Sequence, residues 1–482
     1  MKTNTNCQQK NLSQGYLLVM VLVFGSILFV IISSFFAYIV TQGNAINQRV
    51  ELQRSLDIAE AGLNYYKWFL AHYPNDVTNG TGMPGPYVHT YYDPEGDAIG
   101  EFSLEIASST YCGDVASIDV SSTGHTYDDP SVYRTVSARY ARPSVAEYSY
   151  IINSNVWAGA DRIIVGPYHS NGGIRMDGQN NSTVTSGQES WNCDFCSPAE
   201  IRDGVFTTTA NANPALFSFP SAPINFAGLT IDLAQMQNRA QFAGGIYIGP
   251  SGAYGYRVTF NSNGTITVRR VNGTTEYWGL TSEAGWVQER HVISSTNTNN
   301  TYTIPASCPI IFVQDKVWLD GVVNQKVTIA AADVGSTAIN PQIILNGNIT
   351  YTSATTSGLL AIAEQDVLVG LVVPTDMTLN GIFVAQNGRF GINRYCENCS
   401  SGGINRGLPN SLDPYVFRNS LTVNGTIVSN GREGTKWTSG GTWISGFNNR
   451  VNSYDRNLVN SPPPLVPKTS DVFVITEWRD HQ

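Results

Sequence analysis

A single apolar stretch near the N-terminus constrains the fold of this chain more than any other feature of its sequence. Residues 11–48 contain no charged side chain, and residues 16–40 are apolar apart from Gly25 and three serines. A helix of that length spans about 37 Å, whereas the hydrocarbon core of a bilayer is about 30 Å thick. The apolar part of a cleaved signal peptide is shorter, about 7–15 residues, and ends at a small-residue site. The stretch therefore predicts a transmembrane helix rather than a signal peptide or a buried core helix.

The charged residues on either side of this stretch predict its orientation. Lys2 and Lys10 precede it, whereas Arg49 and Glu51 follow it as a mixed pair. Because positively charged flanks stay in the cytoplasm, the N-terminus is expected inside and the remaining chain outside. We therefore expect a single-pass protein with an extracytoplasmic body, whose first helix contacts membrane lipid.

The predicted helix continues beyond the membrane as an amphipathic segment. Apolar residues recur there at spacings of three or four, which is the pattern of one helical face. This stripe consists of Leu52, Leu56, Ala59, Leu63, Tyr66 and Leu70. Pro74 then favours the end of the helix, so that residues 16–72 form one rod. Such a stripe packs either on the chain's own body or, at least in part, on neighbouring copies in a filament.

The N-terminal residues resemble those of type IV pilin-like proteins, most closely the PilX-type minor pilins. A short leader with two lysines ends in Ser13-Gln14-Gly15, an uncharged helix begins at Tyr16, and the helix continues into Ala59-Glu60-Ala61-Gly62-Leu63. The resemblance implies that a prepilin peptidase removes residues 1–15 by cutting after Gly15, and that Tyr16 is then N-methylated. It also implies other pilin-like subunits and the pilus assembly machinery as partners.

One residue departs from the pattern of the major pilins. Most of them carry Glu at the fifth mature position, where this chain has Met20. In that family the carboxylate is thought to pair with the amine of a neighbouring subunit, and a buried ion pair of this kind sets register. Its absence favours a minor subunit, at the tip or in an accessory position. It also allows a permanently anchored surface protein that never enters a filament.

The rest of the sequence predicts a mainly β fold after the long N-terminal α-helix. Residues 73–145 contain short alternating strands, expected to form a small β-rich, pilin-like head on the helix stripe. In residues 146–482, strands alternate with Asn-Gly, Asp-Gly and Gly-Gly turns at irregular intervals. This pattern favours a right-handed parallel β-helix. An antiparallel sandwich is the alternative, because the same turn residues also form the hairpins of such a fold. Residues 255–278, with turn signals at Asn263-Gly264 and Asn272-Gly273, predict an inserted hairpin. The resemblance to PilX-type proteins extends to segments of this body.

Six of the seven cysteines lie in the part of the chain predicted to be extracytoplasmic. They comprise two CxxC pairs, Cys193 with Cys196 and Cys396 with Cys399, and the separate Cys112 and Cys308. Oxidation outside the cell favours disulfides, although the four CxxC sulfurs could instead form a tetrahedral zinc site. Connectivity cannot be read from spacing, and Cys112 with Cys308 is a candidate third pair.

No sequence signature of catalysis accompanies these features. HExxH, phosphate-loop, dinucleotide and Gly-x-Ser-x-Gly motifs are absent. His169 and Ser170 lie in a Gly-rich turn, which favours local hydrogen bonding over a nucleophile. Acidic residues that could face a groove are scattered: Asp315, Asp320, Asp333, Glu364, Asp366 and Asp376. We therefore do not expect an enzyme; a polysaccharide-active one is the weakest alternative.

Composition and aromatic residues suggest the kind of partner. The net charge of −9 argues against nucleic acid, because a phosphate-binding protein needs a basic face. Only 13% of the residues are charged, whereas a typical soluble protein has roughly 25%. Such a low content of charged residues resembles that of many surface proteins. If the body mediates adhesion, Tyr254, Tyr256 and Trp278 are candidates for stacking on a surface polysaccharide. No cofactor is expected beyond the zinc alternative.

Overall fold

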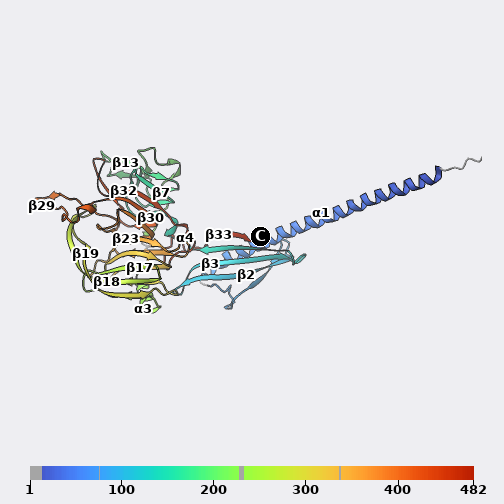
Figure 1. Cartoon of the computed structure of the whole chain (residues 1–482), viewed down its shortest axis with the longest axis horizontal. Helices are drawn as coiled ribbons and strands as arrows, with labels where there is room; N and C mark the ends of the chain where they lie inside the picture. The colour runs from blue at the N-terminus through green and yellow to red at the C-terminus, as the bar shows by residue number, and fades with distance from the viewer. Residues whose placement is uncertain (1–12, 75, 227–232, 336–337, 482) are drawn as a thin grey trace, which may run out of the picture.

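The computed structural model describes residues 13–74, 76–226, 233–335 and 338–481. Its first element is the helix α1 (Ser13–His72), a rod that extends away from the rest of the molecule (Figure 1). Within its apolar half, the hydroxyls of Ser26, Ser34 and Thr41 donate to backbone carbonyls three or four residues earlier. These polar groups are therefore satisfied inside the helix, as a lipid environment requires. The predicted leader largely lies outside the described residues.

A five-stranded antiparallel sheet covers the second half of α1, and we call this helix-and-sheet unit the head. Its strands, in spatial order, are β1 (Tyr87–Tyr92), β2 (Ala98–Tyr111), β3 (Asp114–Thr126), β4 (Tyr133–Ala141) and β33 (Val474–His481). Alternate residues of β3 are buried, as expected of a sheet with one face on a core. Leu104, Ile118 and Val136 of the sheet pack with Leu63 and Tyr66 of the helix.

The helix and the sheet approach each other closely because glycines lie at the contact. A Cβ at Gly124 would lie 2.5 Å from the backbone nitrogen of Ala59, and a Cβ at Gly62 would lie 2.2 Å from Ser122 Oγ. The backbones can pack at this distance only while both positions lack a side chain. The sequence Ala-Gly-Leu in the helix therefore serves packing on the chain's own sheet.

The body consists mainly of parallel strands stacked in ladders. The longest ladder runs in the order β16 (Ile246–Ile248), β20 (Ile310–Val313), β22 (Lys326–Ala331), β24 (Gly358–Ala363), β26 (Asp376–Ala385), β30 (Phe417–Ser429), β5 (Tyr150–Ile152), β8 (Tyr168–Ser170), β11 (Val184–Ser186) and β15 (Phe217–Ser218). A second ladder contains β17 (Tyr256–Asn261), β21 (Val317–Val323), β23 (Ile343–Tyr351), β25 (Val367–Val369) and β27 (Phe390–Gly391). Further parallel pairs join β32 (Thr442–Ser453), β7 (Arg162–Val165) and β10 (Gln179–Asn180), and join β6 (Val156–Ala158), β9 (Ile174–Met176) and β14 (Val205–Phe206).

This stacking excludes the antiparallel sandwich and is compatible with the predicted β-helix, whose handedness remains a prediction. Apolar residues at equivalent positions of successive strands, such as Ile329, Ala361 and Phe383, form one continuous core. Smaller elements decorate the stack: 3-10 turns at Val145–Glu147, Pro214–Leu216 and Asp413–Tyr415; helices α3 (Leu233–Phe242) and α4 (Arg456–Asn460); and strands β12 (Ser190–Cys193), β13 (Glu200–Asp203), β28 (Ser400–Ser401), β29 (Ile404–Asn405) and β31 (Lys436–Ser439).

The order of the strands along the stack differs from their order in the sequence. Strand β5, the first strand of the body, pairs in register with β30, so that Tyr150 lies beside Ile427. Residues 150–218 extend the ladder in one direction from this junction. Residues 246–429 begin at the opposite end and return to the junction, so the body starts and finishes near its middle.

The inserted hairpin is longer than the predicted 255–278. Strands β17 and β18 (Thr265–Thr281) turn at Asn263-Gly264, and β18 then pairs with β19 (Gly285–Thr303). Asn272-Gly273 does not form a turn but lies inside β18, where the register with β19 shifts. A β-bulge accepts glycine as readily as a tight turn does, which is why the sequence signal was misleading there.

The predicted boundary between head and body also needs correction, because the last residues of the chain return to the head. Strand β33 pairs antiparallel with β4, although its residues were assigned to the body. It covers the edge of β4 that would otherwise present unpaired backbone groups. Ion pairs across the sheet reinforce this contact, between Arg134 and Asp480 and between Arg139 and Glu477.

Candidate functional site

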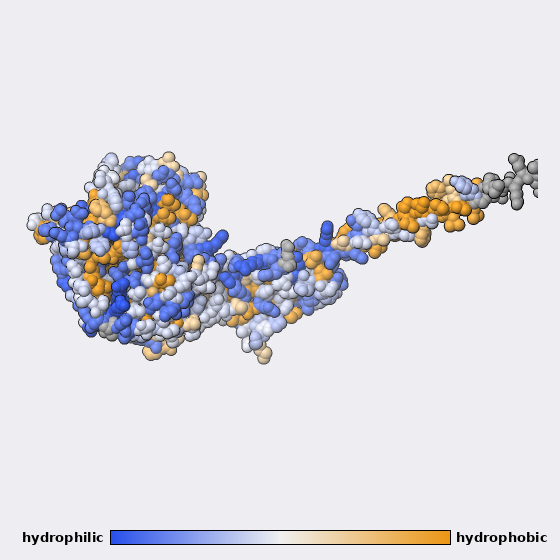
Figure 2. Space-filling view, viewed as in Figure 1, coloured by the Kyte–Doolittle hydropathy of each residue, from blue (hydrophilic) through white to orange (hydrophobic). Residues whose placement is uncertain are grey.

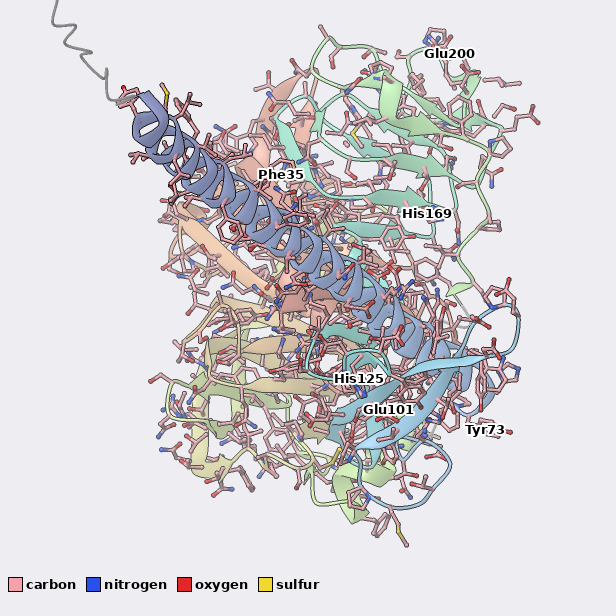
Figure 3. All side chains as sticks on the ribbon, turned by 90° about the vertical axis from the view of Figure 1, so that its right-hand side faces the viewer. Phe35, Tyr73, Glu101, His125, His169 and Glu200 are labelled. Carbon is pink, nitrogen blue, oxygen red and sulfur yellow. A yellow bond between two sulfur atoms is a disulfide. The ribbon has the colours of Figure 1, made fainter. Side chains whose placement is uncertain are left out.

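The first half of α1 is the largest exposed apolar surface of the described residues. Its most apolar 18-residue window has a mean hydropathy of 2.8, and none of it is buried. Figure 2 shows this apolar surface along the rod, in contrast to the mixed surface of the body. Phe35, labelled in Figure 3, is 63% exposed. Soluble proteins rarely expose a continuous patch of this size, so this surface is a candidate for contact with lipid or with other helices.

The predicted processing residues lie at the start of α1. Gly15 and Tyr16 belong to the first turn of α1, and the Tyr16 side chain is 72% exposed. Met20, at the position where the major pilins carry Glu, is also exposed. The exposed half of α1 contains no carboxylate before Glu51.

A polar collar marks the level at which the helix enters the head. Glu51 accepts a hydrogen bond from Thr126 Oγ1 at 2.6 Å, and Ser55 donates to the carbonyl of Val132 at 2.9 Å. Arg54 pairs with Glu51 at 3.2 Å. Because these groups need polar partners or water, the collar sets the deepest level to which α1 can enter a bilayer.

The predicted packing stripe faces the chain's own sheet. Ala59 and Leu63 are buried, whereas Leu52 and Leu56 are half-buried near the collar. The buried face also includes Ile58 and Phe69, because the sheet covers a face of the helix that is wider than the predicted stripe. The Tyr140 hydroxyl donates to the carbonyl of Leu63, and burial raises the pKa of Tyr140. This half of α1 is therefore already occupied.

The six described cysteines form three disulfides. Cys193 bonds to Cys196, Cys396 bonds to Cys399, and each of these pairs closes a local loop. In this state none of the four sulfurs is a free thiolate for the zinc alternative, and the described residues contain no cluster of three or more metal-binding side chains. Cys112 bonds to Cys308 and joins the head to the body.

The three aromatic residues proposed for ligand stacking do not form one platform. Tyr254 is 37% exposed, and its hydroxyl accepts from Arg290 at 3.0 Å. Trp278 is half-buried beneath the guanidinium of Arg406, 3.5 Å from the ring centre. Tyr256 packs against the body core. Two of the three rings already have cationic partners, and the third serves packing.

His169 and the scattered acids have structural partners. His169 Nδ1 lies 2.8 Å from Thr185 Oγ1, its Nε2 lies 2.9 Å from Asn171, and burial lowers its pKa. Figure 3 shows His169 on a strand of the stack. Ser170 donates to the carbonyl of Ser154 at 2.7 Å. Hydrogen bonds from protein groups reach every acid of the candidate set: Asp315, Asp320, Asp333, Glu364, Asp366 and Asp376.

Comparisons with known proteins do not assign a family to the chain. No family model and no curated protein matches it. Among solved structures, the competence-associated pilin ComZ from Thermus thermophilus matches over 89% of this chain and 97% of its own. The identity is 12% and the TM-score is 0.29, so the proposal below rests on this chain's own residues and geometry.

Proposed function

We propose that this chain is a minor type IV pilin-like subunit, in a tip or accessory position, that displays a parallel-stranded body at the cell surface for pilus assembly or adhesion. The division of α1 into two halves carries the proposal. The half that follows residue 50 has its apolar face buried by the head, whereas the apolar half before it has no partner among the described residues. A helix of this kind can reside in lipid first and pack against the helices of other subunits afterwards.

Two features favour a minor position over the repeating shaft. Met20 offers no carboxylate for a register-setting ion pair with a neighbouring subunit. The body also adds more than 300 residues beyond the head. A domain of this size is easier to accommodate at the end of a filament than in a closely packed shaft. The role is structural or binding, with lipid, pilin-like subunits and the assembly machinery as partners.

The same absence of a carboxylate favours one alternative, in which the protein stays in the membrane as a permanent anchor for the body. The two functions differ in the chemistry of the N-terminus. Mass spectrometry of the protein isolated from its native membranes distinguishes them, because processing removes residues 1–15 and adds a methyl group to Tyr16. A chain that begins at N-methyl-Tyr16 supports the pilin-like role, and an intact leader supports the permanent anchor.

A pair of matched variants tests whether Gly15 directs the processing. Gly15→Val is expected to leave the leader attached, because it changes the residue next to the cleaved bond. Gly25→Val is the control, since a Cβ at Gly25 meets no atom within 4 Å and the position lies inside the apolar span. Equal processing of the two variants would contradict the assignment of the cleavage site.

A further inference from the structure

A cleft of about 590 Å³, lined by many polar side chains, lies between the long hairpin and the parallel stack. One wall is formed by residues 281–291 of strands β18 and β19 and their connecting turn. The other wall is formed by the turns that precede strands β21, β23, β25 and β27. Its volume falls within the range of about 300–1,000 Å³ that is usual for ligand sites. We call this feature the hairpin cleft.

The stack wall of the hairpin cleft presents a column of polar side chains. Lys316, Gln342, Asp366 and Arg389 each precede a strand of one ladder, and the residues that follow them pair in register. The column therefore advances by one strand spacing, about 4.8 Å, per residue. This regular spacing along an open wall suits an extended chain of similar units better than a compact ligand.

Hydrogen bonds within the fold already occupy the carboxylates of the cleft. Asp366 accepts from the backbone of Arg389 at 2.8 Å and from Gln342 at 3.1 Å. Glu289 accepts from Asn393 and, at 2.9 Å, from the Tyr395 hydroxyl. Burial alone would raise the pKa of Glu289, but these bonds and His291 hold it below its ordinary value. The acids therefore shape the cleft and leave little capacity to bind a cation.

Lys316 differs from the other charged groups of the hairpin cleft. Arg290 pairs with Glu276, and Arg389 pairs with Glu283 at 3.1 Å. The Lys316 ammonium is only partly exposed and lies 5.9 Å from the centre of the Trp318 ring. The charges of Asp315, Glu289 and Asp366 also act on it, but no hydrogen bond or salt bridge of its ammonium is formed among the described residues. Removal from water lowers its pKa. A half-buried ammonium without a direct hydrogen bond or ion pair is costly, and an anionic ligand that supplies one would offset that cost.

We propose that the hairpin cleft binds an acidic oligosaccharide, with a sugar carboxylate held by the Lys316 ammonium. Side-chain amides of Gln288, Asn340 and Asn387 line the same cleft and can both donate to and accept from sugar hydroxyls. The column spacing is close to the length of one pyranose unit. The inference deepens the proposed display function, on which it rests for the outward placement of the body.

Binding of a short oligogalacturonate to the purified full-length protein in detergent tests the proposal. Its methyl ester is the matched probe, because it keeps the sugar chain and removes the charge. Titration calorimetry is expected to show at least ~10-fold tighter binding of the acid, equivalent to about 1.4 kcal/mol. Lys316→Gln should abolish this preference, and Lys67→Gln, on an exposed part of α1, should retain it.

A second variant keeps the test informative if Lys316→Gln folds poorly. Gln288 is exposed at the rim, so Gln288→Glu adds a repelling charge without disturbing the core; it should weaken the acid but not the ester. Three outcomes would overturn the proposal: equal affinity for both probes, no binding of either probe at millimolar concentration, or a preference for the acid over the ester that persists in Lys316→Gln. None of these outcomes bears on leader processing, which the native N-terminus reports separately.

Discussion

Removal of the Cys112–Cys308 disulfide is expected to destabilise the extracytoplasmic part more than removal of either CxxC disulfide. Cys112 and Gly113 form the two-residue tip of the β2–β3 hairpin, with φ of 52° and 86°. Such a tip normally favours Asn-Gly, because both residues need positive φ. The cysteine accepts this unfavourable conformation where its sulfur reaches the body, which indicates that the bridge matters to the fold.

The expected magnitude follows from the lengths of the loops that the disulfides close. In the chain-entropy model, a separation of 196 residues corresponds to about 5 kcal/mol at 25 °C. The three-residue separation of Cys193 and Cys196 corresponds to about 2 kcal/mol. With a urea slope of about 3 kcal/mol/M, the two losses would lower the unfolding midpoint by about 1.7 M and about 0.7 M.

The assay is urea unfolding of the full-length protein in detergent, followed by tryptophan fluorescence. The double variant Cys112→Ser/Cys308→Ser is compared with the control Cys193→Ser/Cys196→Ser under non-reducing conditions. Arg239 still pairs with Asp114 at 2.7 Å in the first variant, so the head and the body keep a contact. Similar midpoints for the two variants would refute the reasoning, because only loop length distinguishes them in this model.

Two further predictions concern buried groups of the body. Glu433→Ala should cost about 3–5 kcal/mol in unfolding free energy, because it removes the carboxylate that accepts two hydrogen bonds from Nη2 of the buried Arg162. Arg162→Met/Glu433→Leu should be closer to wild type, and a chemical-denaturation series that ranks the two variants in the opposite order would contradict this. Burial lowers the folded-state pKa of His169, so the unfolded chain binds more protons and stability is lost as pH falls below about 6.5, by at most about 1.4 kcal/mol per pH unit. His169→Asn should lose less stability than wild type between pH 7 and pH 5.5, and parallel pH profiles of the thermal midpoint would exclude this contribution.

The amino-acid sequence was sufficient for features that depend on local periodicity. The uncharged run predicted the long apolar helix, and spacings of three and four predicted the side of residues 52–70 that packs. Alternation and turn residues predicted a mainly β chain. These features can be predicted from the sequence because hydrophobic periodicity and backbone preference depend on residues that are only a few positions apart.

Only the tertiary structure decided which segments pair. Many strands of the body are short and similarly apolar, so the sequence could not show that Tyr150 lies beside Ile427 or that Val474–His481 joins the head. Asn272-Gly273 looked like a turn, but its partner strand made it a bulge. The column that contains Lys316 exists only because successive strands stack in register. Which strands pair depends on the total apolar surface that all the strands bury together, and no local sequence pattern determines that total.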